Sequence, residues 1–179
     1  MKKFILLLVA IMCIQALVLA VPENVTTGPY KISFDLGMPK EVYSVTVSDP
    51  KEEESLGGDK SIKYKINIKN DTTVSAFALI SLTENAPLLT PHEMEKTMRY
   101  FLSENGFTNF ETSEREIDGT TGAIGAGDVS ISGREMKECI ASYYPFNDLA
   151  VFIVSVYPWE EGTLSLLKTI HIEKINTTI

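Results

Sequence analysis

The stretch that most constrains the fold is Leu149–Tyr157, which reads LAVFIVSVY. Its β-branched and aromatic residues fall on both alternating faces, with Val151 and Ile153 on one face and Phe152 and Val154 on the other. A strand that is apolar on both faces must be covered on both faces. We therefore predict a central strand here, with a sheet built around it.

Residues 1–20 carry the pattern of a secretory signal peptide. Lys2 and Lys3 form a basic start, an apolar run follows, and Val18–Ala20 offers a cleavage site with small residues. An uncleaved membrane anchor is the alternative, but the apolar run is shorter than the roughly 20 residues that a spanning helix needs. We expect residues 21–179 to form one domain, secreted or at the cell surface, with no membrane span.

The expected domain is acidic. The full chain has a formal net charge of −8, and loss of Lys2 and Lys3 with a segment that contains no acidic residue takes this charge to −10. An acidic surface is a poor match for nucleic acid or for anionic lipid. We therefore expect no nucleic-acid partner.

Only one cysteine, Cys139, lies in the expected mature domain. A single cysteine cannot form an internal disulfide. Because Cys139 lies in a strand-like run, we expect a small buried side chain. Nothing near it in the sequence would lower the thiol pKa, as a catalytic nucleophile requires.

Three sequons for N-linked glycosylation begin at Asn24, Asn70 and Asn176. Two of them lie at the ends of the expected mature domain, and the third lies at an expected turn. These are places where a glycan can be accommodated.

Alternating hydrophobicity predicts strands along most of the chain. The clearest example is Ile62–Lys69, in which apolar residues point one way and three lysines and an asparagine point the other. Further strands are predicted at residues 30–36, 41–48, 73–82, 107–117, 122–131 and 134–144, with a short extended end at 171–175. Residues 21–29 are interpreted as a polar lead-in, and residues 49–61 as a charged loop.

Two segments predict helices, at residues 91–105 and 160–170. Thr90 fits the N-cap of the first helix, Pro91 fits its first position, and Glu93 completes a capping box. The strands follow one another mostly as hairpins. The pattern therefore predicts an α+β fold, in which an antiparallel sheet of about eight strands carries a central helix and a C-terminal helix.

The glycine-rich segment Gly122–Asp128 invites comparison with a phosphate-binding loop. It lacks the Gly-Lys-Ser/Thr ending, and no helix follows it. We instead expect a thin, bulged or kinked strand against which another element packs closely. A partner's backbone lying against the glycines is the functional alternative.

The order of elements in the second half resembles a known fold. A capped helix is followed by a strand that ends in Asp118-Gly119, a hairpin through Ser132-Gly133, the apolar strand, and a helix that closes in Lys168–Ile172. Over about residues 74–172 this order resembles the PsbP-like fold, found in a photosystem II extrinsic subunit, a Ran-binding factor and many secreted prokaryotic domains. The resemblance implies a non-enzymatic binding or assembly module. The docking residues of the photosynthetic subunits have no counterpart here, so it implies no photosystem role.

The candidate cation ligands are four acidic residues around Gly57-Gly58: Glu52, Glu53, Glu54 and Asp59. Carboxylate oxygens suit calcium, but the spacing is not that of an EF-hand, so a solvated loop is the favoured interpretation. His92 and His171 each lack the sequence partners of a zinc site. We therefore expect no cofactor.

Aromatic residues gather near two prolines and are the candidate partner-binding residues: Tyr143, Tyr144, Tyr157 and Trp159. Tyrosine and tryptophan are common anchors of interfaces, although they also form lids over cores, and the lid is the favoured interpretation. A partner would bind at a sheet edge or at the corner formed by residues 157–159.

These observations favour a secreted, non-enzymatic binding or assembly module whose partner is a protein or a component of the cell envelope. One alternative is an envelope-associated hydrolase with dispersed catalytic residues, which a histidine–carboxylate pair in a pocket would favour. Another is a cation-binding or small-ligand-binding domain, which an internal cavity or an ordered acidic loop would favour.

Overall fold

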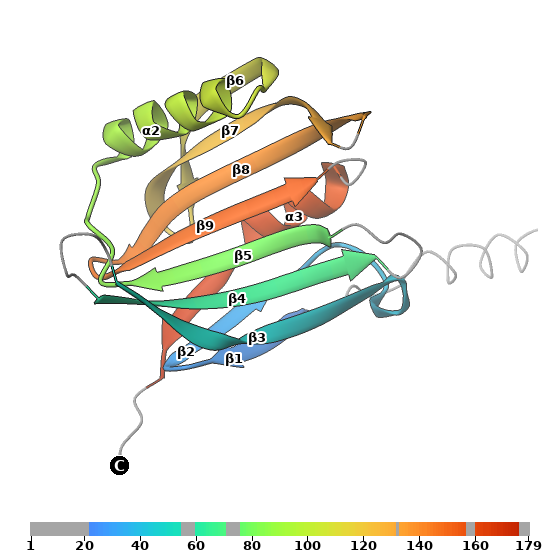
Figure 1. Cartoon of the computed structure of the whole chain (residues 1–179). Helices are drawn as coiled ribbons and strands as arrows, with labels where there is room; N and C mark the ends of the chain where they lie inside the picture. The colour runs from blue at the N-terminus through green and yellow to red at the C-terminus, as the bar shows by residue number, and fades with distance from the viewer. Residues whose placement is uncertain (1–21, 55–59, 71–75, 132, 157–159, 176–179) are drawn as a thin grey trace, which may run out of the picture.

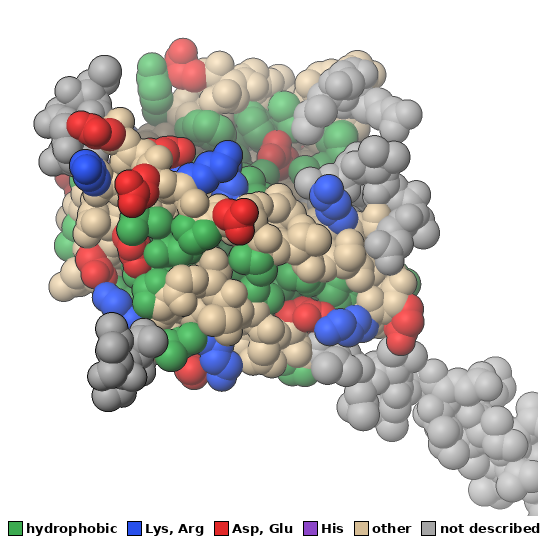
Figure 2. Space-filling model, turned by 60° about the horizontal axis from the view of Figure 1, so that its bottom comes forward, with side chains coloured by type: hydrophobic (Ala, Val, Ile, Leu, Met, Phe, Trp, Pro, Cys, Tyr) green, Lys and Arg blue, Asp and Glu red, His purple; other side chains and the backbone are tan. Residues whose placement is uncertain are grey.

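The computed structural model describes residues 22–54, 60–70, 76–131, 133–156 and 160–175. Within these residues the chain forms an α+β fold with two antiparallel sheets, which confirms the predicted class. Acidic, basic and hydrophobic side chains are interspersed over the face drawn in Figure 2.

The larger sheet has seven strands in the order β3–β4–β5–β9–β8–β7–β6. Their bounds are β3 Tyr43–Glu54, β4 Lys60–Asn70, β5 Ala76–Glu84, β6 Thr108–Ile117, β7 Thr120–Ile131, β8 Arg134–Phe146 and β9 Leu149–Val156. β9 occupies the middle position, between β5 and β8. The prediction of a central strand is therefore confirmed.

A second, smaller sheet corrects the prediction of one sheet with about eight strands. It has the order β1–β2–β10, with bounds β1 Glu23–Thr27, β2 Tyr30–Phe34 and β10 His171–Lys174. β1 lies in the segment interpreted as a polar lead-in. β10, near the C-terminal end of the described chain, pairs with β2, near its N-terminal end. In this pairing Ile172 lies beside Ile32. No local sequence pattern encodes that long-range pairing.

The main core lies between the two sheets. One face of the large sheet, called the inner face here, packs against the small sheet and against helix α3 (Glu160–Thr169), and Figure 1 shows both of these behind the large sheet. Ile66, Ile80 and Ile153 of the large sheet are almost completely buried, together with Ile32 of β2 and Leu166 of α3. A short 3-10 turn, η1 (Lys40–Val42), leads into β3.

Helix α2 (Pro91–Glu104) packs on the opposite, outer face. Its capping box is formed as predicted, because Glu93 N donates to Thr90 Oγ1 at 3.3 Å and Thr90 N donates to the Glu93 carboxylate at 2.8 Å. Met94, Met98 and Leu102 are buried on its sheet-facing side. Figure 1 shows α2 at the β6–β8 end of the sheet, away from β3 and β4.

The glycines of β7 allow this close packing. A Cβ atom on Gly125 would lie 2.8 Å from Leu102 Cδ1 and 2.8 Å from Met98 Sδ, both of α2. A Cβ atom on Gly127 would lie 2.6 Å from Phe110 Cβ of β6. This confirms the interpretation of the segment as a strand against which another element packs closely.

The prediction of a loop at residues 49–61 is wrong for the first half of that segment. β3 continues to Glu54 and pairs with β4, and an irregularity between Ser48 and Lys51 accommodates Asp49 and Pro50. The run of charged residues obscured this strand in the sequence. In the sheet, the charged side chains of this part of β3 are exposed to solvent, and Glu53 pairs with Lys63 of β4.

Candidate functional site

The outer face of the large sheet has a covered half and an open half. Helix α2 packs against β6, β7 and β8. Figure 1 shows no described helix over the outer side of β9, β5, β4 or β3. The outer side of these four strands is called the open face below.

The middle strand shows the consequence most clearly. Its inner residues Val151 and Ile153 are buried, whereas its outer residues Phe152, Val154 and Val156 are only partly buried. The sequence predicts cover on both faces of this strand. The structure provides complete cover on the inner face only, so apolar side chains of the central strand remain partly accessible to solvent.

Two rows of cross-strand neighbours define the middle of the open face. One row runs from β4 through β5 and β9 to β8: Asn67, Leu79, Val154 and Ile140. The next row is Lys65, Ser81, Phe152 and Ser142. Directly opposed residues in antiparallel strands have Cβ atoms about 4.5–5.5 Å apart, so the side chains of each row are neighbours. The first row ends on β8 at Ile140, which is 1% exposed because α2 covers it. The rows place apolar side chains beside a lysine.

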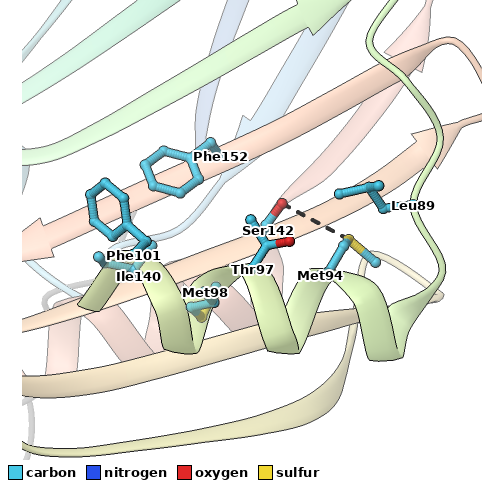
Figure 3. A pocket seen from close by; sticks show the side chains of 8 residues that line it. All are labelled: Leu89, Met94, Thr97, Met98, Phe101, Ile140, Ser142 and Phe152. Atoms are coloured by element: carbon cyan, nitrogen blue, oxygen red, sulfur yellow. Dashed lines mark hydrogen bonds between the residues drawn. The ribbon is translucent and has the colours of Figure 1, made fainter. Parts of the chain in front are cut away.

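A groove of about 140 Å³ lies where the open face meets α2. Figure 3 shows its lining: Leu89, Met94, Thr97, Met98, Phe101, Ile140, Ser142 and Phe152. The rings of Phe101 and Phe152 meet edge to face, with centroids 6.2 Å apart. Phe101 is 40% exposed although it is aromatic. The groove is smaller than the 300–1,000 Å³ of sites for drug-sized ligands, and it fits one apolar side chain or group.

Lysines dominate the β4 side of the open face. Four of them project outward from β3 and β4: Lys51, Lys63, Lys65 and Lys69. The outward-facing acids on the described strands of this region are Glu53, whose carboxylate pairs with Lys63, and Glu138 of the adjacent β8. Burial raises the pKa of the Glu138 carboxyl. The four lysines outnumber these two acids. The open face is therefore positive within a chain of net charge −8.

The structure separates the four candidate aromatic residues. Tyr143 is 0% exposed and packs in the main core, so it offers no surface to a partner. Tyr144 is partly buried on the outer side, where its hydroxyl donates to Pro87 O at 2.6 Å. Tyr157 and Trp159 lie outside the described residues.

The described acidic residues of the candidate cation set do not converge. Glu52, Glu53 and Glu54 are successive residues of β3, so their side chains alternate between the two faces of the sheet. Glu53 is paired with Lys63. Asp59 lies outside the described residues.

The glycosylation candidates differ in position. Asn24 is exposed on β1, and Asn70 is the last residue of β4. Asn176 lies outside the described residues.

Cys139 is buried in the main core, as the sequence predicts. Burial raises the pKa of its thiol to about 11, so the reactive thiolate is scarce near neutral pH. This environment is that of a structural cysteine.

A histidine–carboxylate pair lies in a polar depression of about 420 Å³ beside α3 and the turn at Asp118. His171 Nδ1 is 2.7 Å from Asp118 Oδ1, and His171 Nε2 is 3.5 Å from Glu173 Oε1. Both ring nitrogens therefore face carboxylates, which favours a charged imidazole over a free general base. The hydroxyl of Thr169, also at this depression, already accepts from Asp35 N at 2.8 Å. Its proton is within hydrogen-bond distance of Ser165 O at 2.7 Å and of Asp35 O at 3.1 Å.

The same contacts tie the C-terminal strand to the β6–β7 turn. Ile172 N donates to Asp118 Oδ2 at 3.0 Å, next to the His171 contact. The hydrogen bond to Asp118, together with the negative charges of Asp118 and Glu173, raises the pKa of His171 above 6.5. The interactions of Asp118 with His171 and Ile172 therefore stabilise the contact between β10 and the β6–β7 turn.

The interaction of His171 with Asp118 predicts a pH dependence of stability. Because the folded protein holds a proton on His171 more tightly than the unfolded chain does, the stabilisation is complete below pH 6.5 and is lost as the pH rises through the folded pKa. The imidazole is 55% exposed, so we expect less than about 1 kcal/mol. Urea unfolding at pH 5.5 and pH 8.5 should show a larger loss in the wild type than in His171→Gln. An equal loss in both proteins would contradict this role.

Comparison with protein-family models, curated proteins and solved structures found no match. None of the described helices is long and apolar enough to cross a membrane. The open face, the groove and the polar depression are the features of the molecule that bear on function.

The residues of the open face were not among the candidates that the sequence suggested. Two signals in the sequence pointed to them, namely the outward lysines of the strand at Ile62–Lys69 and the second apolar face of the strand at Leu149–Tyr157. The sequence does not reveal that these two strands share one face, because β5 lies between them and the pairing of β5 with β9 joins distant parts of the chain.

Proposed function

We propose that this protein is a secreted, non-enzymatic binding module whose open face docks an acidic segment of another protein that carries apolar side chains. The observation that supports the proposal most strongly is the partly exposed apolar surface of β9 and β5 beside the outward lysines of β4. Apolar surface of this kind, bordered by polar residues, is typical of protein interaction sites.

The two parts of the open face suit the two features of this partner. The groove that Phe101 and Phe152 help to line is of a size for one buried apolar anchor, and a few such anchors provide most of the affinity in many interfaces. The lysines complement carboxylates at the rim of the interface. At physiological salt the Debye length is about 8 Å, so the nearby lysines outweigh the more distant negative charge of the domain.

The β3 edge of the large sheet is a poorer docking site than the open face. β3 forms one edge of the large sheet, and it contains Pro50, an irregularity between Ser48 and Lys51, and a charged end. These features oppose the addition of another strand. The open face is therefore the better candidate of the two, and the corner at residues 157–159 lies outside the described residues.

The enzyme alternative has one supporting observation, the His171–Asp118 pair. Its chemistry favours a structural role, because both imidazole nitrogens face carboxylates and the nearby Thr169 hydroxyl is already engaged. We therefore propose binding as the function. A secretory signal at residues 1–20, a PsbP-like fold and a partner at the cell exterior, either a protein or a component of the cell envelope, complete the proposal.

An anionic apolar probe tests the proposed surface. We expect 1-anilinonaphthalene-8-sulfonate to bind the purified protein at a saturable site, because it combines an apolar ring system with a negative charge. Phe152→Ser should weaken binding at least about tenfold by removing a wall of the groove. Lys65→Glu should weaken it roughly fivefold, with the difference shrinking at high salt.

Lys96→Glu is the matched control for the charge reversal, because Lys96 is exposed on α2, the helix whose other side borders the groove. We expect it to bind the probe as the wild type does. Absence of saturable binding, or equal weakening by Lys65→Glu and Lys96→Glu, would count against the open face as a binding surface.

A further inference from the structure

Three metal-ligating side chains meet at the junction of α2 with β6, on the side of the helix away from the open face. His92 and Glu95 lie three residues apart on α2, so they share one side of the helix. Glu114 projects from β6 toward the same point. One ligand atom from each residue lies within 4.8 Å of the other two. Among the described residues this is the one group of three that converges so closely.

We propose that His92, Glu95 and Glu114 bind a divalent transition-metal ion, with Zn²⁺ as the representative ion. One imidazole and two carboxylates form a mixed nitrogen and oxygen donor set, which suits zinc and its neighbours better than calcium or magnesium. Three protein ligands with water in the fourth position are a common arrangement for zinc. The two glutamates supply the negative charge that a divalent cation requires.

The distances are compatible with this coordination. Zinc bonds to nitrogen and oxygen are about 2.0–2.2 Å long, so ligand atoms around a tetrahedral ion lie about 3.4 Å apart. His92 and Glu114 are exposed and Glu95 is only partly buried. Small rotations of these side chains, about 1 Å at their ends, therefore bring the donors to coordination distance without any movement of the backbone.

The surroundings hold Glu95 in place for this role. Thr112 Oγ1, from β6, donates to Glu95 Oε1 at 2.9 Å. Hydrogen bonds of this kind orient metal ligands, and their loss typically lowers metal affinity 10–100-fold.

Arg99 is the competitor for the same carboxylate. Its Nη2 lies 3.2 Å from Glu95 Oε1, in an ion pair whose arginine side chain is 57% exposed. An exposed pair of this kind is worth little, so an incoming metal ion can displace the guanidinium at small cost. The freed Arg99 retains its hydrogen bond to Thr112 at 2.6 Å.

The first experiment is thermal unfolding of the purified protein after treatment with EDTA, with and without ZnCl₂. Zinc at about 100 times its dissociation constant should raise the Tm by about 5–10 °C, because the ion links α2 to β6 in the folded state only. His92→Ala and Glu114→Gln should each abolish most of this shift. Both residues are exposed, so these variants should unfold near the wild-type temperature when zinc is absent.

His171→Ala is the matched control, because His171 is the other histidine of the chain and also lies beside two carboxylates. We expect it to retain the zinc shift. Thr112→Val should retain the three ligands but raise the zinc dissociation constant about tenfold in a calorimetric titration. No zinc shift in the wild type, a full shift in His92→Ala, or a shift that disappears only in His171→Ala would overturn the proposal.

Discussion

The Gly122→Ala substitution is expected to reduce the free energy of unfolding by about 3 kcal/mol. A Cβ atom on Gly122 would lie 2.5 Å from the backbone oxygen of Ser142 and 2.6 Å from Tyr143 Cβ. Both atoms belong to β8, which is hydrogen-bonded to β7 along most of its length. Because Tyr143 is also fully buried, neither group can move away without disturbing the main core.

Urea unfolding measures this loss, and two other glycines supply controls. A Cβ atom on Gly125 would meet only the flexible ends of Leu102 and Met98, so Gly125→Ala should cost less, about 1–2 kcal/mol. Gly119 has open space around it but a φ of +72°, so Gly119→Ala should cost about 1–2 kcal/mol through backbone strain alone. A smaller loss in Gly122→Ala than in these two variants would contradict the packing described for β7 and β8.

Two valines of one strand should differ strongly when each is shortened to alanine. Val151 is 0% exposed on the inner side of β9, and Val154 is partly exposed on the outer side. Removal of buried methyl groups costs their transfer free energy and leaves a cavity, so Val151→Ala should lower stability by about 2–3 kcal/mol. Val154→Ala should cost less, about 1 kcal/mol, because its side chain is only partly buried and keeps some contact with water in the folded protein.

The two variants control for each other, because they change the same residue type in the same strand. Loss of β-propensity is therefore similar in both, and the difference between them reports burial. Chemical unfolding of both variants under one set of conditions gives this difference directly. Equal losses of 2–3 kcal/mol would mean that the outer side of β9 is covered in the isolated protein.

The sequence was sufficient for the elements whose pattern is local. The capping box at Thr90 and Glu93 marked the start of α2, and the two-faced apolar run marked β9 as central. Both patterns reflect interactions within a few residues or the burial of one strand. Such features can be derived from spacing alone.

The second sheet could not be derived in this way. β1 is short and carries only Val25 as an apolar residue, and β10 has only Ile172. Both strands are stabilised by pairing with β2. The pairing of β10 with β2 joins residues about 140 positions apart, such as His171 and Ser33. Long-range pairing of short strands leaves no periodic signal in the sequence.

The candidate site was only partly predictable for a related reason. The outward lysines of β4 and the outer apolar residues of β9 are visible in the sequence as separate patterns. Their position on one face depends on the strand order, and their exposure depends on where α2 lies across the sheet. The group of His92, Glu95 and Glu114 likewise requires the packing of α2 beside β6.

Alkylation of a cysteine placed at position 154 tests whether the outer side of β9 is open in the isolated protein. The experiment uses Val154→Cys in a Cys13→Ser background, with the native Cys139 as an internal reference. Cys139 is buried and the pKa of its thiol is raised to about 11. We expect iodoacetamide to modify the new thiol at least about 100-fold faster than Cys139 near neutral pH, because an accessible thiol has a pKa of about 8.5. A new thiol that reacts as slowly as Cys139 would show that the face is covered, and would contradict the proposed binding surface.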